Sequence, residues 1–167
     1  MTTLERKRPD WSGDERSQLA QVLDYNRVAV RMKAEGLGDE QARQRLTPSP
    51  LTSIAGIVAH LVWVERYWIE RVLGQRDVTF PWSDEHPDAD WEEGDTRALV
   101  DLLEDYDRAC ATARDIVSEL DLDHIPAPDS QQPISVRATL LHMIEETARH
   151  AGQLDILREL TDGATGE

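Results

Sequence analysis

Apolar residues recur at helical spacing in four long stretches of this sequence, and no stretch of useful length shows the strict alternation typical of a strand. The chain of 167 residues therefore favours an all-α fold, a four-helix bundle formed by one domain over residues 1–167. We expect frayed ends over about residues 1–10 and 161–167. Residues 39–46 can add a short helical segment. The predicted long helices cover about residues 14–35, 53–73, 95–120 and 135–160.

The helix boundaries carry start signals, and one connection is unusually long. Ser53 and Ser135 directly precede the second and fourth predicted helices and are expected as their N-caps. Between the second and third helices, residues 75–94 are predicted to form a long loop that is rich in acidic residues and contains Trp82 and Trp91. Loops of more than about a dozen residues are uncommon in compact domains and are often functional.

The charge balance excludes several classes of partner. With 33 acidic and 18 basic side chains, the formal net charge is −15, so the surface repels phosphate backbones and acidic lipids, and no nucleic acid or membrane partner is expected. The apolar stretch 54–73 is interrupted by charged residues and is not predicted to span a membrane. Residues 1–10 lack the apolar core of a signal peptide, so we expect a cytoplasmic location. The single cysteine, Cys110, forms no internal disulfide and is expected to be a small buried side chain.

Three residues form a candidate metal site. Glu146 and His150 lie four positions apart in the last predicted helix, so their side chains project from the same face. His60 lies in the second predicted helix, at one edge of its apolar stripe, as Glu146 and His150 do in theirs. If these two helices pack together, the three residues can bind one divalent metal ion and leave coordination positions open, as in catalytic sites.

Four further residues are candidates for support of this site or for a substrate pocket. Gln153 stacks above the Glu146 and His150 pair and can hydrogen-bond to one of them, and His142 is a further support or an alternative ligand. Trp63 and Tyr67 lie near the face of His60. The pattern alone leaves a simpler interpretation open, because a helical Glu/His pair is often only a surface contact and a lone histidine is often a core residue.

The chain resembles the DinB-like (YfiT-like) superfamily of small metalloenzymes, close to its mycothiol-dependent transferase and isomerase branch. The residues that carry the resemblance are the segment 53–68, SIAGIVAHLVWVERYW, and the segment 140–155, LLHMIEETARHAGQLD. It implies a four-helix bundle in which His60, Glu146 and His150 bind a divalent ion. Zinc is the expected ion and nickel the alternative.

The resemblance also implies a function. A low-molecular-weight thiol, expected to be mycothiol, would bind the metal as a thiolate and attack a small electrophile in detoxification or a stress response. The implied protein is a metal-dependent thiol S-transferase, and a homodimer is one assembly open to it. Two alternatives remain at this point: a metal-dependent hydrolase or isomerase that uses a metal-bound water, and a non-catalytic metal-binding stress protein.

Overall fold

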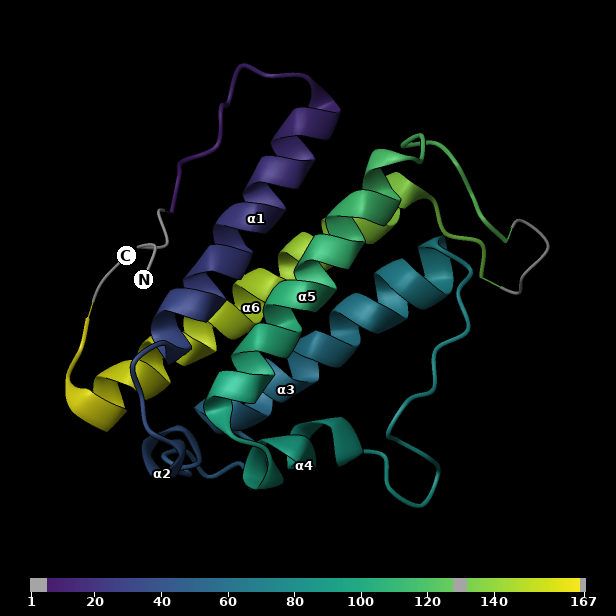
Figure 1. The fold of residues 1–167 in the computed structure, drawn as a ribbon. Helices are drawn as coiled ribbons and strands as arrows, with labels where there is room; N and C mark the ends of the chain where they lie inside the picture. Colours follow the sequence, from purple (N-terminus) through teal and green to yellow (C-terminus); the bar gives the residue numbers. More distant parts are fainter. Residues whose placement is uncertain (1–5, 128–131, 166–167) are drawn as a thin grey trace.

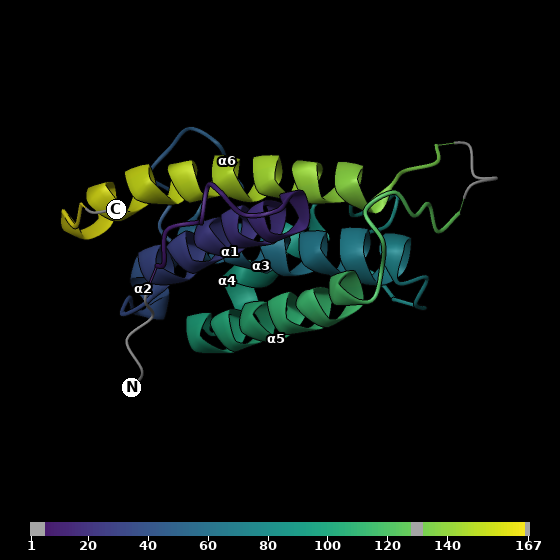
Figure 2. The same cartoon turned by 90° about the horizontal axis from the view of Figure 1, so that it is seen from above.

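The computed structural model describes residues 6–127 and 132–165, and every regular element in this part of the chain is helical. The prediction of an all-α fold is confirmed. The two views in Figures 1 and 2 show the long helical segments lying side by side, with α1 and α3 between α5 on one side and α6 on the other. The elements in chain order are α1 (Glu15–Ala34), α2 (Asp39–Ala42), α3 (Ile54–Glu65), η1 (Arg66–Leu73), α4 (Ala89–Thr96), α5 (Leu99–Ser118) and α6 (Val136–Asp162).

The predicted N-caps are confirmed. The Ser53 side chain accepts a hydrogen bond from the Gly56 backbone at the start of α3, and the Ser135 side chain accepts one from Ala138 at the start of α6. Each bond satisfies one of the free N–H groups of the first turn. Helix α6 ends at Gly163, whose φ of 77° is a left-handed conformation that glycine adopts without a steric penalty.

Two boundaries differ from the sequence prediction. Helix α4 begins at Ala89, inside the predicted loop 75–94, and the following long helix begins at Leu99 rather than near residue 95. The α4 segment is rich in acidic residues and has no continuous apolar stripe, so its sequence carries no helical periodicity. We infer that α4 is stabilised by its contacts with α3 rather than by an amphipathic sequence of its own.

The second predicted helix has the expected extent, but it changes from an α-helix to a π-helix along its length. After Glu65 the chain continues as η1, a π-helical segment with wider turns, and the Gly74 backbone donates to Ile69 five residues earlier. Such segments are rare and frequently lie at functional sites. Its first turn carries Tyr67 and Trp68, both of which face a cavity described below.

The predicted frayed ends are only partly described. Residues 1–5 and 166–167 lie outside the described residues, and residues 161–162 continue α6 instead of fraying. Among the described residues, no helix is both long enough and apolar enough to cross a membrane.

One buried ion pair joins α1 to α3 inside the core. The Arg27 guanidinium donates to both carboxylate oxygens of Glu65, at 2.7 and 2.6 Å, and the two side chains are only 5% and 2% exposed. A charge buried at this depth is tolerated only when it is paired, and losing one partner of such a pair costs about 3–5 kcal/mol. The pair therefore fixes how these two helices meet, and α3 carries part of the candidate site.

Helix α4 packs closely against the N-terminal half of α3 because two glycines meet there. A Cβ atom placed on Gly94 would lie 2.5 Å from the backbone nitrogen of Gly56 and 2.6 Å from the carbonyl carbon of Ala55. Neither atom can move without shifting the helix, so only glycine fits at position 94. The distance between the two backbones is set by this contact.

Gly94→Ala is expected to lower the free energy of unfolding by about 1–3 kcal/mol, because the added methyl group forces α4 away from α3. Urea unfolding followed by circular dichroism measures the change. The matched control is Gly152→Ala in α6, where an added Cβ meets nothing within 4 Å. That variant should be about 1 kcal/mol more stable, since alanine is the better helix former. Equal stability of the two variants would contradict the close-contact interpretation.

Candidate metal centre

The structure brings the three predicted ligands together at the contact between α3 and α6. One ligand atom from each of His60, Glu146 and His150 lies within 4.8 Å of the others, so the set could hold one metal ion. The Nε2 atoms of the two histidines are 3.5 Å (His60) and 3.1 Å (His150) from the same oxygen, Oε1 of Glu146. The His150 side chain is almost fully buried and the other two are largely so.

The other ring nitrogen of each histidine has its own acceptor. His60 Nδ1 lies 2.7 Å from Oδ2 of Asp90, and His150 Nδ1 lies 2.8 Å from Oε1 of Gln153. Carboxylate and amide oxygens only accept hydrogen bonds, so each Nδ1 carries the proton and donates it. Each Nε2 atom faces the Glu146 carboxylate, which also only accepts, so the position between them is one for a cation, either a proton or a metal ion.

This arrangement fits a divalent cation. Two imidazole lone pairs and a carboxylate oxygen facing one another are mutually repulsive unless a positive charge lies among them. Hydrogen bonds from the outer nitrogen to a carboxylate or an amide oxygen are the usual way in which proteins orient histidine ligands. Two histidines and one glutamate are a known ligand set of catalytic zinc sites that keep a position open for substrate or water.

The electrostatics of the cluster favour the metal-binding protonation states. Burial lowers the pKa of His150, and the nearby His60 lowers it further, so the imidazole stays neutral. Burial raises the pKa of Glu146, but His150, His60 and Arg149 together outweigh this effect and leave that pKa below its usual value. Metal ligands must be a neutral imidazole and an ionised carboxylate, and these are the forms that the site stabilises.

The remaining predicted site residues fall into two groups. Gln153 contacts His150, as described, while Trp63 and Tyr67 line a cavity of 390 Å³ that also reaches His60. His142 lies apart from the cluster, and its ring packs against Trp68 with the centroids 4.4 Å apart. The structure therefore offers His142 as an aromatic neighbour of the cavity wall rather than as a replacement for Glu146.

Sequence reasoning missed the contribution of α4. Asp90 is 6% exposed and accepts the hydrogen bond from Nδ1 of His60. The next residue, Trp91, stacks on the face of the same imidazole, with the ring centroids 4.2 Å apart and an interplanar angle of 17°. Neither contact with His60 was predicted. Both residues belong to an acidic segment with no periodic pattern, so nothing in their spacing indicated that they reach His60.

The site opens into solvent-accessible space. The 390 Å³ cavity adjoins a larger one of 740 Å³, and Tyr67 and Trp68 line both. Of the three candidate ligands only His60 lines the smaller cavity, so a substrate-sized space lies next to the His60 end of the site.

Comparison with known families supplies the identification. The model of the mycothiol-S-transferase family matches residues 18–163 of the chain. The chain belongs to this family. The match begins within α1, covers the other long helical segments in full and includes all three candidate ligands, and it confirms the resemblance that the two sequence segments indicated. No curated protein matches this chain.

A solved structure supports the fold of this mycothiol-S-transferase family member. The crystal structure of a conserved protein from Enterococcus faecalis superposes with a TM-score of 0.60 at 15% sequence identity, and the match covers 92% of this chain and 100% of the other. At this identity the similarity concerns the fold alone.

The single cysteine is not part of the site. Cys110 is buried in α5, and its Sγ atom lies 3.8 Å from the Glu65 carboxylate on the far side of α3 from solvent. Burial raises the pKa of this thiol strongly, and the negative charge of Glu65 raises it further. The thiol is therefore protonated at neutral pH and is out of reach of a substrate.

We expect Cys110 to be unreactive toward a disulfide reagent such as Ellman's reagent while the protein is folded. One thiol per chain should react once urea unfolds it. Absorbance of the released thiolate measures both rates, and the control is the same titration on Cys110→Ala, which should release nothing in either condition. Rapid reaction of the native protein would contradict this placement of the thiol.

Asp90→Asn is expected to weaken metal binding by about 10- to 100-fold, because the amide no longer stabilises the protonated Nδ1 of His60 as a carboxylate does. Competition with a chromophoric chelator measures the dissociation constant. Asp84→Asn, which makes the same change at an exposed loop position, is the control and should bind like the unsubstituted protein. Equal affinity of the Asp90 variant would show that this hydrogen bond does not support the ligand.

Proposed function

We propose that this protein is a metal-dependent thiol S-transferase with the four-helix-bundle fold, and that it uses mycothiol against small electrophiles in detoxification or a stress response. The observation that carries the proposal is the convergence of two Nε2 atoms and one carboxylate oxygen, with His60 also lining an open cavity. The family match supports the choice of thiol. Zinc is the ion that best suits this ligand set, and nickel is the alternative.

The residues of the chain have distinct roles in this proposal. His60, Glu146 and His150 would hold the divalent ion, which would lower the pKa of a coordinating thiol toward neutrality. Asp90 and Gln153 keep a proton on each Nδ1, so that both Nε2 atoms remain available. The aromatic side chains of the cavity would hold the apolar part of the electrophile by removing its surface from water.

The overall reaction follows from the chemistry of thiols. The thiol loses its proton to solvent, its sulfur forms a bond to an electrophilic carbon, and a leaving group such as chloride departs with the electron pair of the broken bond. The chain supplies no thiol nucleophile of its own, because its one cysteine is buried away from the site. An external thiol is therefore the simplest source of the attacking sulfur.

The open cavity favours catalysis over a purely metal-binding stress protein, since a structural site has no need of adjoining space. A hydrolase or isomerase reaction would use the same ligands with a water or a substrate oxygen. Dependence of turnover on added thiol separates these reactions from S-transfer. The cytoplasmic location and the homodimer remain predictions from the sequence and the resemblance.

His60→Ala and His150→Ala are each expected to abolish bound metal and to lower thiol conjugation by at least about 100-fold, because a site with two protein ligands holds the ion poorly. Inductively coupled plasma mass spectrometry measures metal content, and product formation with mycothiol and an activated aryl chloride measures activity. His124→Ala, at an exposed position outside the cluster, is the control and should keep both. Metal-free protein that conjugates the thiol at the normal rate would refute the proposal.

A further inference from the structure

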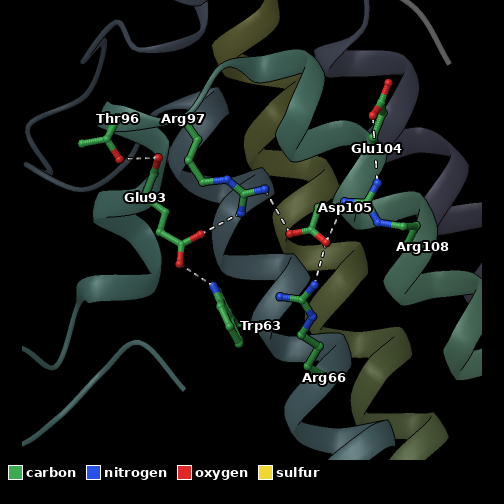
Figure 3. Close-up of polar contacts among 8 residues, drawn as sticks. All are labelled: Trp63, Arg66, Glu93, Thr96, Arg97, Glu104, Asp105 and Arg108. Carbon is green, nitrogen blue, oxygen red and sulfur yellow. Dashed lines mark hydrogen bonds and ion pairs between the residues drawn. The ribbon is translucent and has the colours of Figure 1, made fainter. Parts of the chain in front are cut away.

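Two contacts restrain the side chain of Trp63, a hydrogen bond and a cation–π contact. Its indole Nε1 donates to Oε1 of Glu93 on α4 at 3.1 Å, and the guanidinium of Arg66 lies over its ring at 4.6 Å from the centroid. An indole with its N–H bonded and one face covered by a cation has little freedom to rotate. Figure 3 shows these side chains and their partners.

The two groups that hold Trp63 are joined to each other. Arg97 donates to Glu93 at 2.8 Å and to Asp105 of α5 at 3.1 Å, and Asp105 also accepts from Arg66 at 2.6 Å (Figure 3). Trp63, Glu93, Arg97, Asp105 and Arg66 thus form a closed ring that links α3, α4, α5 and the start of η1. Asp105 is 6% exposed, which protects these ion pairs from screening by salt.

The indole of Trp63 forms part of the wall of the 390 Å³ cavity, which His60 also lines. Its ring meets that of Trp82 at an interplanar angle of 84° and that of Phe80 at 63°, each with the centroids 6.2 Å apart. Trp82 and Phe80 come from the connection between η1 and α4, and they stack on each other at 4.5 Å. These edge-to-face contacts support the indole from the side and leave the cavity an aromatic wall against which a planar group can pack.

The lining of this cavity is dominated by aromatic rings, which come from Trp63, Tyr67, Trp68, Trp82 and Trp91. Its imidazole and its carboxylate, from His60 and Asp90, bond to each other. The N–H of Trp63 is taken by Glu93, so it is not offered to a ligand. An apolar aromatic group would lose little on leaving water here and would gain contact with these rings.

We propose that Trp63 is a specificity-determining residue that selects electrophiles with a planar, apolar, aryl-type group, and that Glu93 is the residue that positions it. This inference rests on the proposed thiol transfer. With an activated aryl chloride, the thiol sulfur forms a bond to the ring carbon, chloride leaves with the bonding electrons, and the thiol proton goes to solvent. Glu93 contacts neither substrate and acts through the orientation of the indole.

The kinetic test compares two electrophiles with the same leaving group, an activated aryl chloride and chloroacetamide, at saturating mycothiol. In Trp63→Leu the ratio of kcat/KM for the aryl chloride to kcat/KM for chloroacetamide should fall about tenfold, because the flat contact surface is lost. The fall should appear in KM for the aryl chloride. An unchanged ratio, or a rise in KM for mycothiol instead, would overturn the proposal.

The positioning role of Glu93 is tested separately. Glu93→Ala should lower the same ratio about threefold, since the indole loses one of its two restraints, and Glu93→Gln should restore most of it because the amide oxygen still accepts from Nε1. Glu92→Gln, an exposed neighbour on α4, should match the unsubstituted protein. Equal losses in the Ala and Gln variants, with circular dichroism and metal content unchanged, would show that Glu93 does not position the indole.

A binding measurement separates this inference from the proposed function. Unreactive m-dinitrobenzene should bind the metal-loaded protein, and its dissociation constant by calorimetry should rise about tenfold in Trp63→Leu. If the protein conjugates no thiol but still shows this rise, the transferase proposal fails and the aryl-binding role of Trp63 stands. If the dissociation constant is the same in both proteins, the role of Trp63 is refuted whatever the activity.

Discussion

The close backbone contact between Gly56 and Gly94 is the constraint on which the site depends. It lets α4 lie directly on α3, and from there α4 supplies Asp90 and Trp91 to His60 and also the carboxylate that holds the indole of Trp63. A larger residue at position 94 would separate the two backbones and lengthen each of these contacts. One short helix thereby orients both a candidate metal ligand and the wall of the substrate cavity.

The two histidines show how a site can be prepared for a cation by hydrogen bonding alone. Each imidazole donates from Nδ1 to an oxygen that only accepts, and its Nε2 faces the Glu146 carboxylate, so the position between them suits a cation. Burial keeps His150 neutral, which further favours this state. The acceptors come from different places: Asp90 lies on a separate helix, while Gln153 lies one turn beyond its own histidine.

The sequence could predict what depends on spacing within a helix. The extents of the long helices and the shared face of Glu146 and His150 follow from periods of three and four residues. The edge of the apolar stripe in the second helix gave His60 as their partner, and the resemblance implied the same three ligands. The sequence could not predict α4, whose acidic sequence has no apolar stripe, nor the pairing of Asp90 with a residue 30 positions earlier. Those features arise from tertiary packing, which local patterns do not record.

The burial of Cys110 has a consequence for a protein that meets electrophiles. Enzymes that carry a reactive thiol in the active site risk alkylation by the compounds that they process, and each such event removes an enzyme molecule permanently. This chain has one cysteine, and the fold keeps it protonated and enclosed beside Glu65. If sulfur is supplied by a diffusible partner, an excess of electrophile exhausts a replaceable small molecule and spares the catalyst.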